Sequence, residues 1–293
     1  MTTFLGKENE FPIMNASCPK ASTVEDLKEL NSCSYTCAIV TKSCTEEFRQ
    51  GNESPNYWQN DNITFNSLGL ANQGYKYYTS LSGFNKPYIL SVAGLTLEEN
   101  LNIISNVAFS TSYGTRYVDA IELNLSCPNV QGKPVCGYDL DATRYLLNKL
   151  EDYECFERIA IGVKLPPYLD RTQLANMADL LSNFPIEFVT CINSLGNGLI
   201  LDDNYDYLLT TKFGGVGGNE IVKAIGLSNC KQFREQLPNH IDVIGCGGIR
   251  TGRDVKEYLT VGGCKIVQIG STLMKEGISC FERIAKEYKE LNN

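Results

Sequence analysis

The chain has 293 residues, of which 43% are hydrophobic and 20% charged, and its formal net charge is −8. Such a composition excludes a disordered chain, because there is enough apolar surface to offset the entropy lost on folding. The acidic balance argues against nucleic acid or an anionic membrane as a partner, since both need a basic surface.

Seven strand-like runs alternate with segments of helical periodicity. In chain order they cover residues 38–41, 88–92, 120–125, 159–165, 188–193, 241–245 and 265–269. This alternation predicts a parallel sheet wrapped by helices. Between two of the runs, Leu174, Met177, Ala178 and Leu181 repeat at helical spacing, which predicts a helix with one face on the sheet.

The length suits one large (β/α)8 TIM barrel, which typically has about 250 residues. A barrel needs an eighth strand, and the only candidate is the short segment 219–224. Because no linker, composition break or internal repeat interrupts the chain, residues 1–293 are interpreted as a single barrel domain. Two polar segments, 45–65 and 202–213, follow the first and fifth predicted strands and are expected to be long βα loops over the active face.

Signals for membranes, export and metal binding are missing from the sequence. The apolar runs are of strand length, far below the roughly 20 residues that span a bilayer, and no cationic, apolar leader begins the chain. The twelve cysteines include no Cys-x-x-Cys pair, and His240 is the only histidine. We therefore expect a cytoplasmic protein with reduced thiols, no membrane partner and no metal.

Polar side chains gather where the predicted strands end, which is where (β/α)8 barrels place their active sites. They are Lys42, Ser43, Asn124, Cys127, Lys164, Asn193 and Ser194. Amides with lysines suit a planar, amide-rich anion, because Asn both donates and accepts and Lys supplies the countercharge. Any one of them could equally satisfy loop backbone, but the whole set favours a ligand site.

Small residues end the last two strands, at Gly247-Gly248 and Gly270-Ser271. Loops in these positions frequently bind phosphate through backbone N–H groups, so a phosphorylated cofactor or substrate is predicted. Tight turns are the competing interpretation for each pair alone. The glycine spacing does not match a Rossmann fingerprint, because Arg250 occupies the position of the last glycine.

Cys127 comes just after the third predicted strand. A thiol there could act as a general base or as a nucleophile. His240 precedes a strand and so belongs to the opposite face of the barrel, which leaves no histidine to activate a nucleophile. A general base is the better hypothesis.

The run Asn124-Leu125-Ser126-Cys127-Pro128-Asn129 resembles that of the dihydroorotate dehydrogenases, specifically the soluble, cysteine-dependent class 1A enzymes. Further matching motifs lie at residues 14–17, 41–43, 66–70, 91–94, 162–167, 193–198, 213–218, 245–248 and 268–270. The resemblance implies a homodimeric barrel that binds FMN and oxidises dihydroorotate to orotate. Fumarate would then reoxidise the flavin and become succinate.

The resemblance also implies roles for single residues. Cys127 would remove the C5 proton of dihydroorotate while the C6 hydride passes to the flavin, and Lys164 would stabilise negative charge near flavin N1. Substrate would be held by Lys42, Asn66, Leu68, Gly69, Leu70, Asn124, Asn129, Asn193 and Ser194. FMN would contact Ala16, Ser17, Lys42, Ser43, Asn124, Lys164, Asn193, Gly217, Gly218, Gly247, Gly248, Gly270 and Ser271.

The sequence departs from the family pattern at Cys18-Pro19, where glycine is usual, at Asn56, where a loop arginine is usual, and at Gln131, where proline is usual. These departures keep two alternatives open. One is a divergent flavin oxidoreductase with another pyrimidine substrate or electron acceptor, and the other is a non-catalytic homologue that binds a flavin or a partner. A tRNA-dihydrouridine synthase would share the barrel and FMN, but the acidic balance counts against it.

Overall fold

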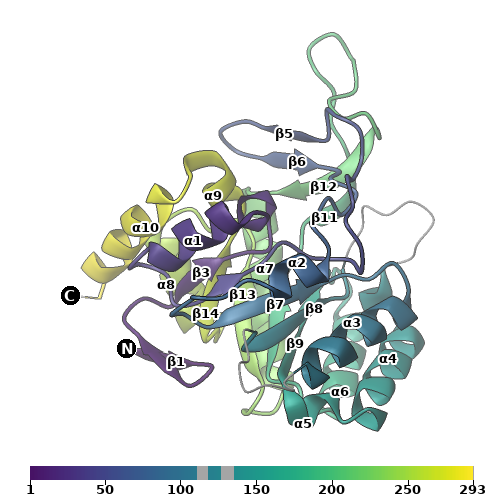
Figure 1. Ribbon diagram of the computed structural model, residues 1–293. Coiled ribbons are helices and arrows are strands. Elements are labelled where there is room, and N and C mark those ends of the chain that lie inside the picture. The colour runs from purple at the N-terminus through teal and green to yellow at the C-terminus, as the bar shows by residue number, and fades with distance from the viewer. Residues whose placement is uncertain (111–117, 127–134, 293) are drawn as a thin grey trace.

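The computed structural model describes residues 1–110, 118–126 and 135–292 (Figure 1). Its centre is an eight-stranded parallel sheet in the order β3-β14-β13-β10-β9-β8-β7-β4. The strands are β3 (Ile13–Asn15), β4 (Ile39–Val40), β7 (Tyr88–Val92), β8 (Ala120–Asn124), β9 (Ala160–Leu165), β10 (Phe188–Cys191), β13 (Asp242–Cys246) and β14 (Ile266–Ile269).

The first and last strands of this order, β3 and β4, are joined by one side chain. Asn15 Nδ2 donates to the Val40 carbonyl at 2.6 Å, and the Val40 N–H donates to Asn15 Oδ1 at 3.1 Å. The Cys37 N–H adds a bond of 2.8 Å to the Ile13 carbonyl. The sheet therefore closes into a barrel, which confirms the predicted (β/α)8 architecture.

The eighth strand is β3, and its predicted position at residues 219–224 is wrong. That segment begins helix α7 (Glu220–Gln236), whose N-cap is Asn219. The Asn219 side chain accepts from the Val222 N–H at 2.9 Å, as expected for a residue that satisfies a free donor at a helix start.

Helices surround the sheet (Figure 1). Besides α7 they are α1 (Val24–Ser32), α2 (Tyr75–Thr79), α3 (Leu97–Phe109), α4 (Leu140–Asp152), α5 (Cys155–Arg158), α6 (Arg171–Leu181), α8 (Gly252–Thr260), α9 (Ser271–Glu276) and α10 (Ser279–Glu290), with 3-10 turns η1 (Pro19–Ala21) and η2 (Cys136–Tyr138). The predicted helical repeat lies in α6, and the four residues that define it, Leu174, Met177, Ala178 and Leu181, are all buried. Within the described residues, no helix is long and apolar enough to cross a membrane.

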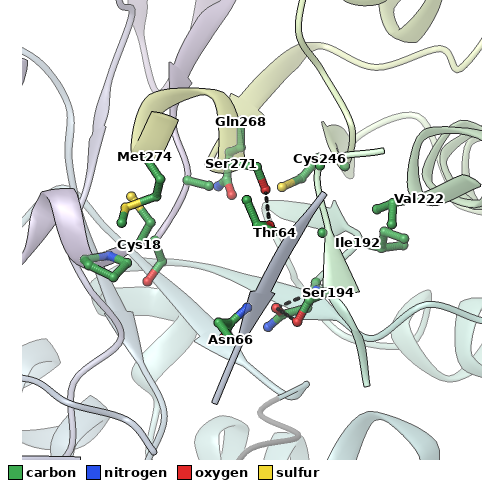
Figure 2. A pocket seen from close by; sticks show the side chains of 18 of the residues that line it. Cys18, Thr64, Asn66, Ile192, Ser194, Val222, Cys246, Gln268, Ser271 and Met274 are labelled. Atoms are coloured by element: carbon green, nitrogen blue, oxygen red, sulfur yellow. Dashed lines mark hydrogen bonds between the residues drawn. The ribbon is translucent and has the colours of Figure 1, made fainter. Parts of the chain in front are cut away.

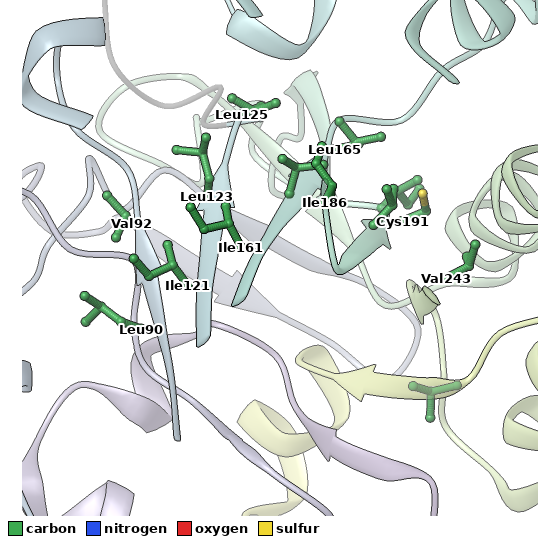
Figure 3. Packing of buried hydrophobic residues seen from close by; sticks show 14 of the residues in the cluster. Leu90, Val92, Ile121, Leu123, Leu125, Ile161, Leu165, Ile186, Cys191 and Val243 are labelled. Carbon is green, nitrogen blue, oxygen red and sulfur yellow. The ribbon is translucent and has the colours of Figure 1, made fainter. Parts of the chain in front are cut away.

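The buried apolar residues form two clusters, one on each side of the barrel wall. Figure 3 shows the larger one, in which Leu90, Ile121 and Ile161 of successive strands pack on the helix side. The smaller cluster fills the interior and includes Phe188, whose ring meets that of Phe4 at a centroid distance of 5.9 Å. Phe4 belongs to an N-terminal hairpin of β1 (Thr2–Phe4) and β2 (Lys7–Asn9). The barrel therefore has an apolar floor.

A second, antiparallel sheet stands outside the barrel, in the order β11-β12-β6-β5 (Figure 1). Its strands are β5 (Tyr57–Gln59), β6 (Thr64–Asn66), β11 (Leu195–Leu199) and β12 (Phe213–Gly217). The segment predicted as a long βα loop over residues 45–65 thus forms the β5–β6 hairpin in its second half. Phe65 is fully buried, and this apolar anchor gives the hairpin its stability.

Candidate functional site

A cavity of about 160 Å³ lies at the carboxyl ends of the barrel strands. Figure 2 shows part of its wall, including Asn66 from the outer sheet and Gln268 from β14. The predicted residues that line it are Ala16, Ser17, Lys42, Ser43, Asn66, Leu68, Leu70, Asn124, Lys164, Asn193, Ser194, Gly217, Gly218, Gly247, Gly248, Gly270 and Ser271. The structure thus brings into one site residues that are up to 255 positions apart in the chain.

Three predicted residues are not among that lining. Gly69 is at a turn with φ +63°, and its carbonyl accepts from Arg49 Nε at 3.3 Å and Nη2 at 3.2 Å. Cys127 and Asn129 lie outside the described residues.

A chain of hydrogen bonds fixes the amides on one wall. Ser17 Oγ and Ser43 Oγ are 2.9 Å apart, and Asn124 Nδ2 donates to Ser43 Oγ at 3.1 Å. Asn124 Oδ1 accepts from the Ser126 hydroxyl at 2.8 Å, and Asn193 Nδ2 donates to that hydroxyl oxygen at 2.8 Å. Because these bonds come from five residues at the ends of four strands, the amides are oriented before any ligand arrives.

Two lysines, Lys42 and Lys164, bring positive charge to the cavity wall. Lys42 is 7% exposed and Lys164 is 4% exposed. Burial disfavours the Lys164 ammonium, but the Cys246 sulfur and the Glu122 carboxylate favour it, and the pKa of Lys164 lies above its ordinary value. Both lysines therefore suit an anionic ligand within the cavity.

The other end of the cavity is lined by backbone. Gly217 has no room for a side chain, because a Cβ there would lie 2.8 Å from Thr64 Oγ1 and 3.0 Å from Ser271 Oγ. Gly218 and Gly248 have φ values of +83° and +63°, which favour glycine. A hydrogen bond of 2.9 Å joins the Thr64 and Ser271 hydroxyls (Figure 2, dashed line). Such a glycine-rich end can approach a phosphate closely.

Sequence reasoning did not find every residue of the wall. The additional ones are Cys18, Pro19, Tyr57, Thr64, Ile192, Val222, Cys246, Ile249, Gln268 and Met274. Gln268 had a usable signal, because it is the one polar residue of the apolar strand β14. Cys18 was noted only as a departure from a family pattern. In the structure burial raises the pKa of its thiol to about 11, so it stays protonated at neutral pH.

Fold and site together define a (β/α)8 barrel whose cavity, at the carboxyl ends of its strands, suits an anionic ligand. More narrowly, the chain belongs to the dihydroorotate dehydrogenase family, whose model matches residues 1–291. This confirms the resemblance seen in the sequence.

Relatives span nearly the whole chain. It is 40% identical to the dihydroorotate dehydrogenase (fumarate) of Lachancea kluyveri, over 98% of this chain and 91% of the relative. It is 39% identical to dihydroorotate dehydrogenase A (fumarate) of Lactococcus lactis subsp. cremoris, over 100% of this chain and 94% of the relative. The structure of the Eimeria tenella dihydroorotate dehydrogenase in complex with ferulenol superposes with a TM-score of 0.79, at 16% identity, over 99% of this chain and 83% of that one. That likeness shows a shared fold.

Proposed function

We propose that the chain oxidises dihydroorotate to orotate in pyrimidine synthesis, with fumarate as the final electron acceptor. The observation that carries the proposal is the full-length similarity to relatives named dihydroorotate dehydrogenase (fumarate). The cavity supports it, because its fixed amides and buried lysines suit a cyclic imide that bears a carboxylate.

FMN is the cofactor that we propose for this site. The residues fit it, since the buried Lys164 ammonium suits the part of a flavin that becomes negative on reduction. The glycine-lined end, with Gly217, Gly218, Gly247 and Gly248, leaves room for a phosphate close to backbone N–H groups. When bound, FMN would supply the hydride acceptor that no amino-acid side chain provides.

Substrate would be held by the wall nearest the outer sheet. Lys42 would offset the carboxylate charge, while Asn124 and Asn193 would pair with the imide. The Asn66 amide is oriented by a bond of 3.2 Å from its Nδ2 to the Gly215 carbonyl. A Cβ at Gly215 would lie 2.3 Å from Ser194 Oγ, so this glycine makes room for Ser194 in the cavity.

We propose Cys127 as the base that takes the C5 proton of dihydroorotate. The residue before it supports this role, because Ser126 is held by Asn124 and Asn193 at the cavity wall. In Cys127→Ala the protein should keep its flavin but lose reduction by dihydroorotate, and parent reduction should rise with pH as the thiolate forms. Cys136→Ala, which changes a half-buried cysteine of η2, is the matched control.

The test begins with the purified protein and its visible spectrum. Anaerobic dihydroorotate should bleach the bound flavin, and fumarate should restore its colour. A bound flavin that dihydroorotate does not reduce would refute the proposed substrate and favour a divergent oxidoreductase or a non-catalytic homologue. Equal reduction of Cys127→Ala and the parent would refute the role of Cys127.

We further propose a cytoplasmic homodimer. Apolar side chains gather on the segment from the end of β11 to the start of β12, where Leu199, Leu201, Tyr205, Tyr207 and Phe213 are all exposed. A large exposed apolar area is typical of a protein interface. Light scattering at micromolar concentration should give twice the 32.5 kDa mass of one chain, and a monomer would contradict this assembly.

A further inference from the structure

A buried polar layer lies between the apolar floor of the barrel and the cavity. Its centre is Glu122 of β8, which is 0% exposed. Its carboxylate meets Gln268 of β14, although β9, β10 and β13 separate these two strands in the sheet order. The contact therefore crosses the inside of the barrel.

Hydrogen bonding decides which way each group points. Lys164 Nζ is 2.8 Å from Gln268 Oε1, and an ammonium can only donate, so the Gln268 oxygen must face the lysine. The Gln268 amide nitrogen then faces Glu122 and donates to its Oε2 at 2.5 Å. Thr190 Oγ1 donates to the same oxygen at 2.9 Å. Glu122 thus serves as an acceptor in both contacts, which suits a carboxylate.

Fold stability does not account for a carboxylate at this position. A buried charge costs free energy that an apolar side chain of similar volume would avoid. Glu122 Oε1 has no hydrogen-bond partner among the described residues, so the group is only half satisfied. Costly buried polar groups of this kind are typical of functional sites.

We propose that Glu122 is a positioning residue that acts on Lys164 through Gln268. It fixes the Gln268 amide so that its oxygen holds the Lys164 ammonium at the cavity wall, and it supplies the buried countercharge of that ammonium. In this way it sets how strongly the cavity stabilises negative charge on a bound flavin. The inference rests on the proposed FMN site but not on the proposed substrate.

The sign of the change in the flavin midpoint potential separates this role from a direct electrostatic effect of the Glu122 charge on the flavin. Loss of a nearby negative charge, with Lys164 unmoved, would raise the midpoint potential of the flavin. If Glu122 instead holds Lys164, its loss releases the ammonium and lowers the potential, in the same direction as loss of Lys164 itself. A purely structural role would move the potential in neither direction.

The experiment measures the midpoint potential of the FMN-loaded protein by reductive titration with a reference dye. We compare the parent, Glu122→Met, Lys164→Met and the double variant. Glu122→Met, which removes both the acceptor and the charge, should shift the potential negative by at least half the shift of Lys164→Met, and the double variant should be no more negative than Lys164→Met alone. A positive shift, no shift, or additive shifts would overturn the proposal.

Two more variants keep the test decisive. Gln268→Met breaks the link between Glu122 and Lys164 while Glu122 stays in place, so it should also give a negative shift, even if Glu122→Met fails to fold. Thr190→Val removes one hydrogen bond to Glu122 but leaves the contacts from Glu122 to Gln268 and from Gln268 to Lys164 in place. It should shift the potential by less than a quarter of the Lys164→Met shift. A Gln268→Met potential equal to that of the parent would overturn the proposal.

The readout uses neither dihydroorotate nor fumarate. A protein that holds FMN but is not reduced by dihydroorotate therefore refutes the proposed function, while the midpoint potentials can still be measured and compared. A protein that takes up no FMN overturns the positioning role as well.

Discussion

Replacement of Asn15 by leucine should weaken the closure of the barrel. The Asn15 side chain is fully buried and stands in for main-chain pairing between β3 and β4. Leucine has a similar volume but no polar atom, so the N–H and C=O of Val40 would lose these partners. Each unpaired buried group costs roughly 1–3 kcal/mol, and we expect the free energy of unfolding to fall by about 3 kcal/mol.

Thermal unfolding followed by far-UV circular dichroism measures this loss. For a chain of this size, 1 kcal/mol corresponds to roughly 2 °C, so the Tm of Asn15→Leu should lie about 6 °C below that of the parent. Asn148→Ala, an exposed position on α4, is the control and should stay within about 1 °C. If the Tm of Asn15→Leu equals that of the control, the hydrogen bond from the Cys37 N–H to the Ile13 carbonyl is enough to close the barrel, and the closure argument is wrong.

Two further substitutions test the packing and the electrostatics of the fold. Gly162→Ala places a Cβ 2.2 Å from a ring carbon of Phe188, so unfolding free energy should fall by about 1–3 kcal/mol. Adding Phe188→Leu should recover part of that loss in urea titrations, and no recovery would refute the clash. Burial opposes ionisation of Asp254, but bonds from Lys223 and from backbone N–H groups outweigh it and lower its pKa. A lowered pKa gives stability that is present above the unfolded value near 3.9 and lost as the pH falls through the folded value. Asp254→Asn should therefore cost about 2–4 kcal/mol at pH 7 and progressively less as the pH falls below about 3.9, and a cost that does not change with pH would contradict this reasoning.

The sequence predicted the long barrel strands well, because a strand covered on both faces is a continuous apolar run. The run at residues 88–92 coincides with β7 (Tyr88–Val92). The missed strand β3 has only three residues, and a side chain rather than a pattern closes its edge. The strands β5 and β6 were missed for a similar reason, since three-residue strands carry too little periodicity to recognise.

The site was predictable wherever it depends on strand ends. Parallel strands end at one face, so Lys42, Asn124 and Asn193 could be placed together without knowledge of their contacts. Glu122 and Gln268 could not be found in this way. Each is a polar residue within a buried strand, but only the closed barrel shows that two strands far apart in the sheet order meet across its interior.

The outer sheet changes how this enzyme could be redesigned. Its β5–β6 hairpin comes from the segment after β4, and its β11–β12 hairpin comes from the segment after β10. Pairing of Asn66 with Gly215 joins the two hairpins. In most barrels such loops can be exchanged one at a time, but here each provides a paired edge for the other. To transfer substrate specificity to another barrel, both segments would therefore have to be grafted together. A single transplanted loop would leave an unpaired strand edge beside the active site.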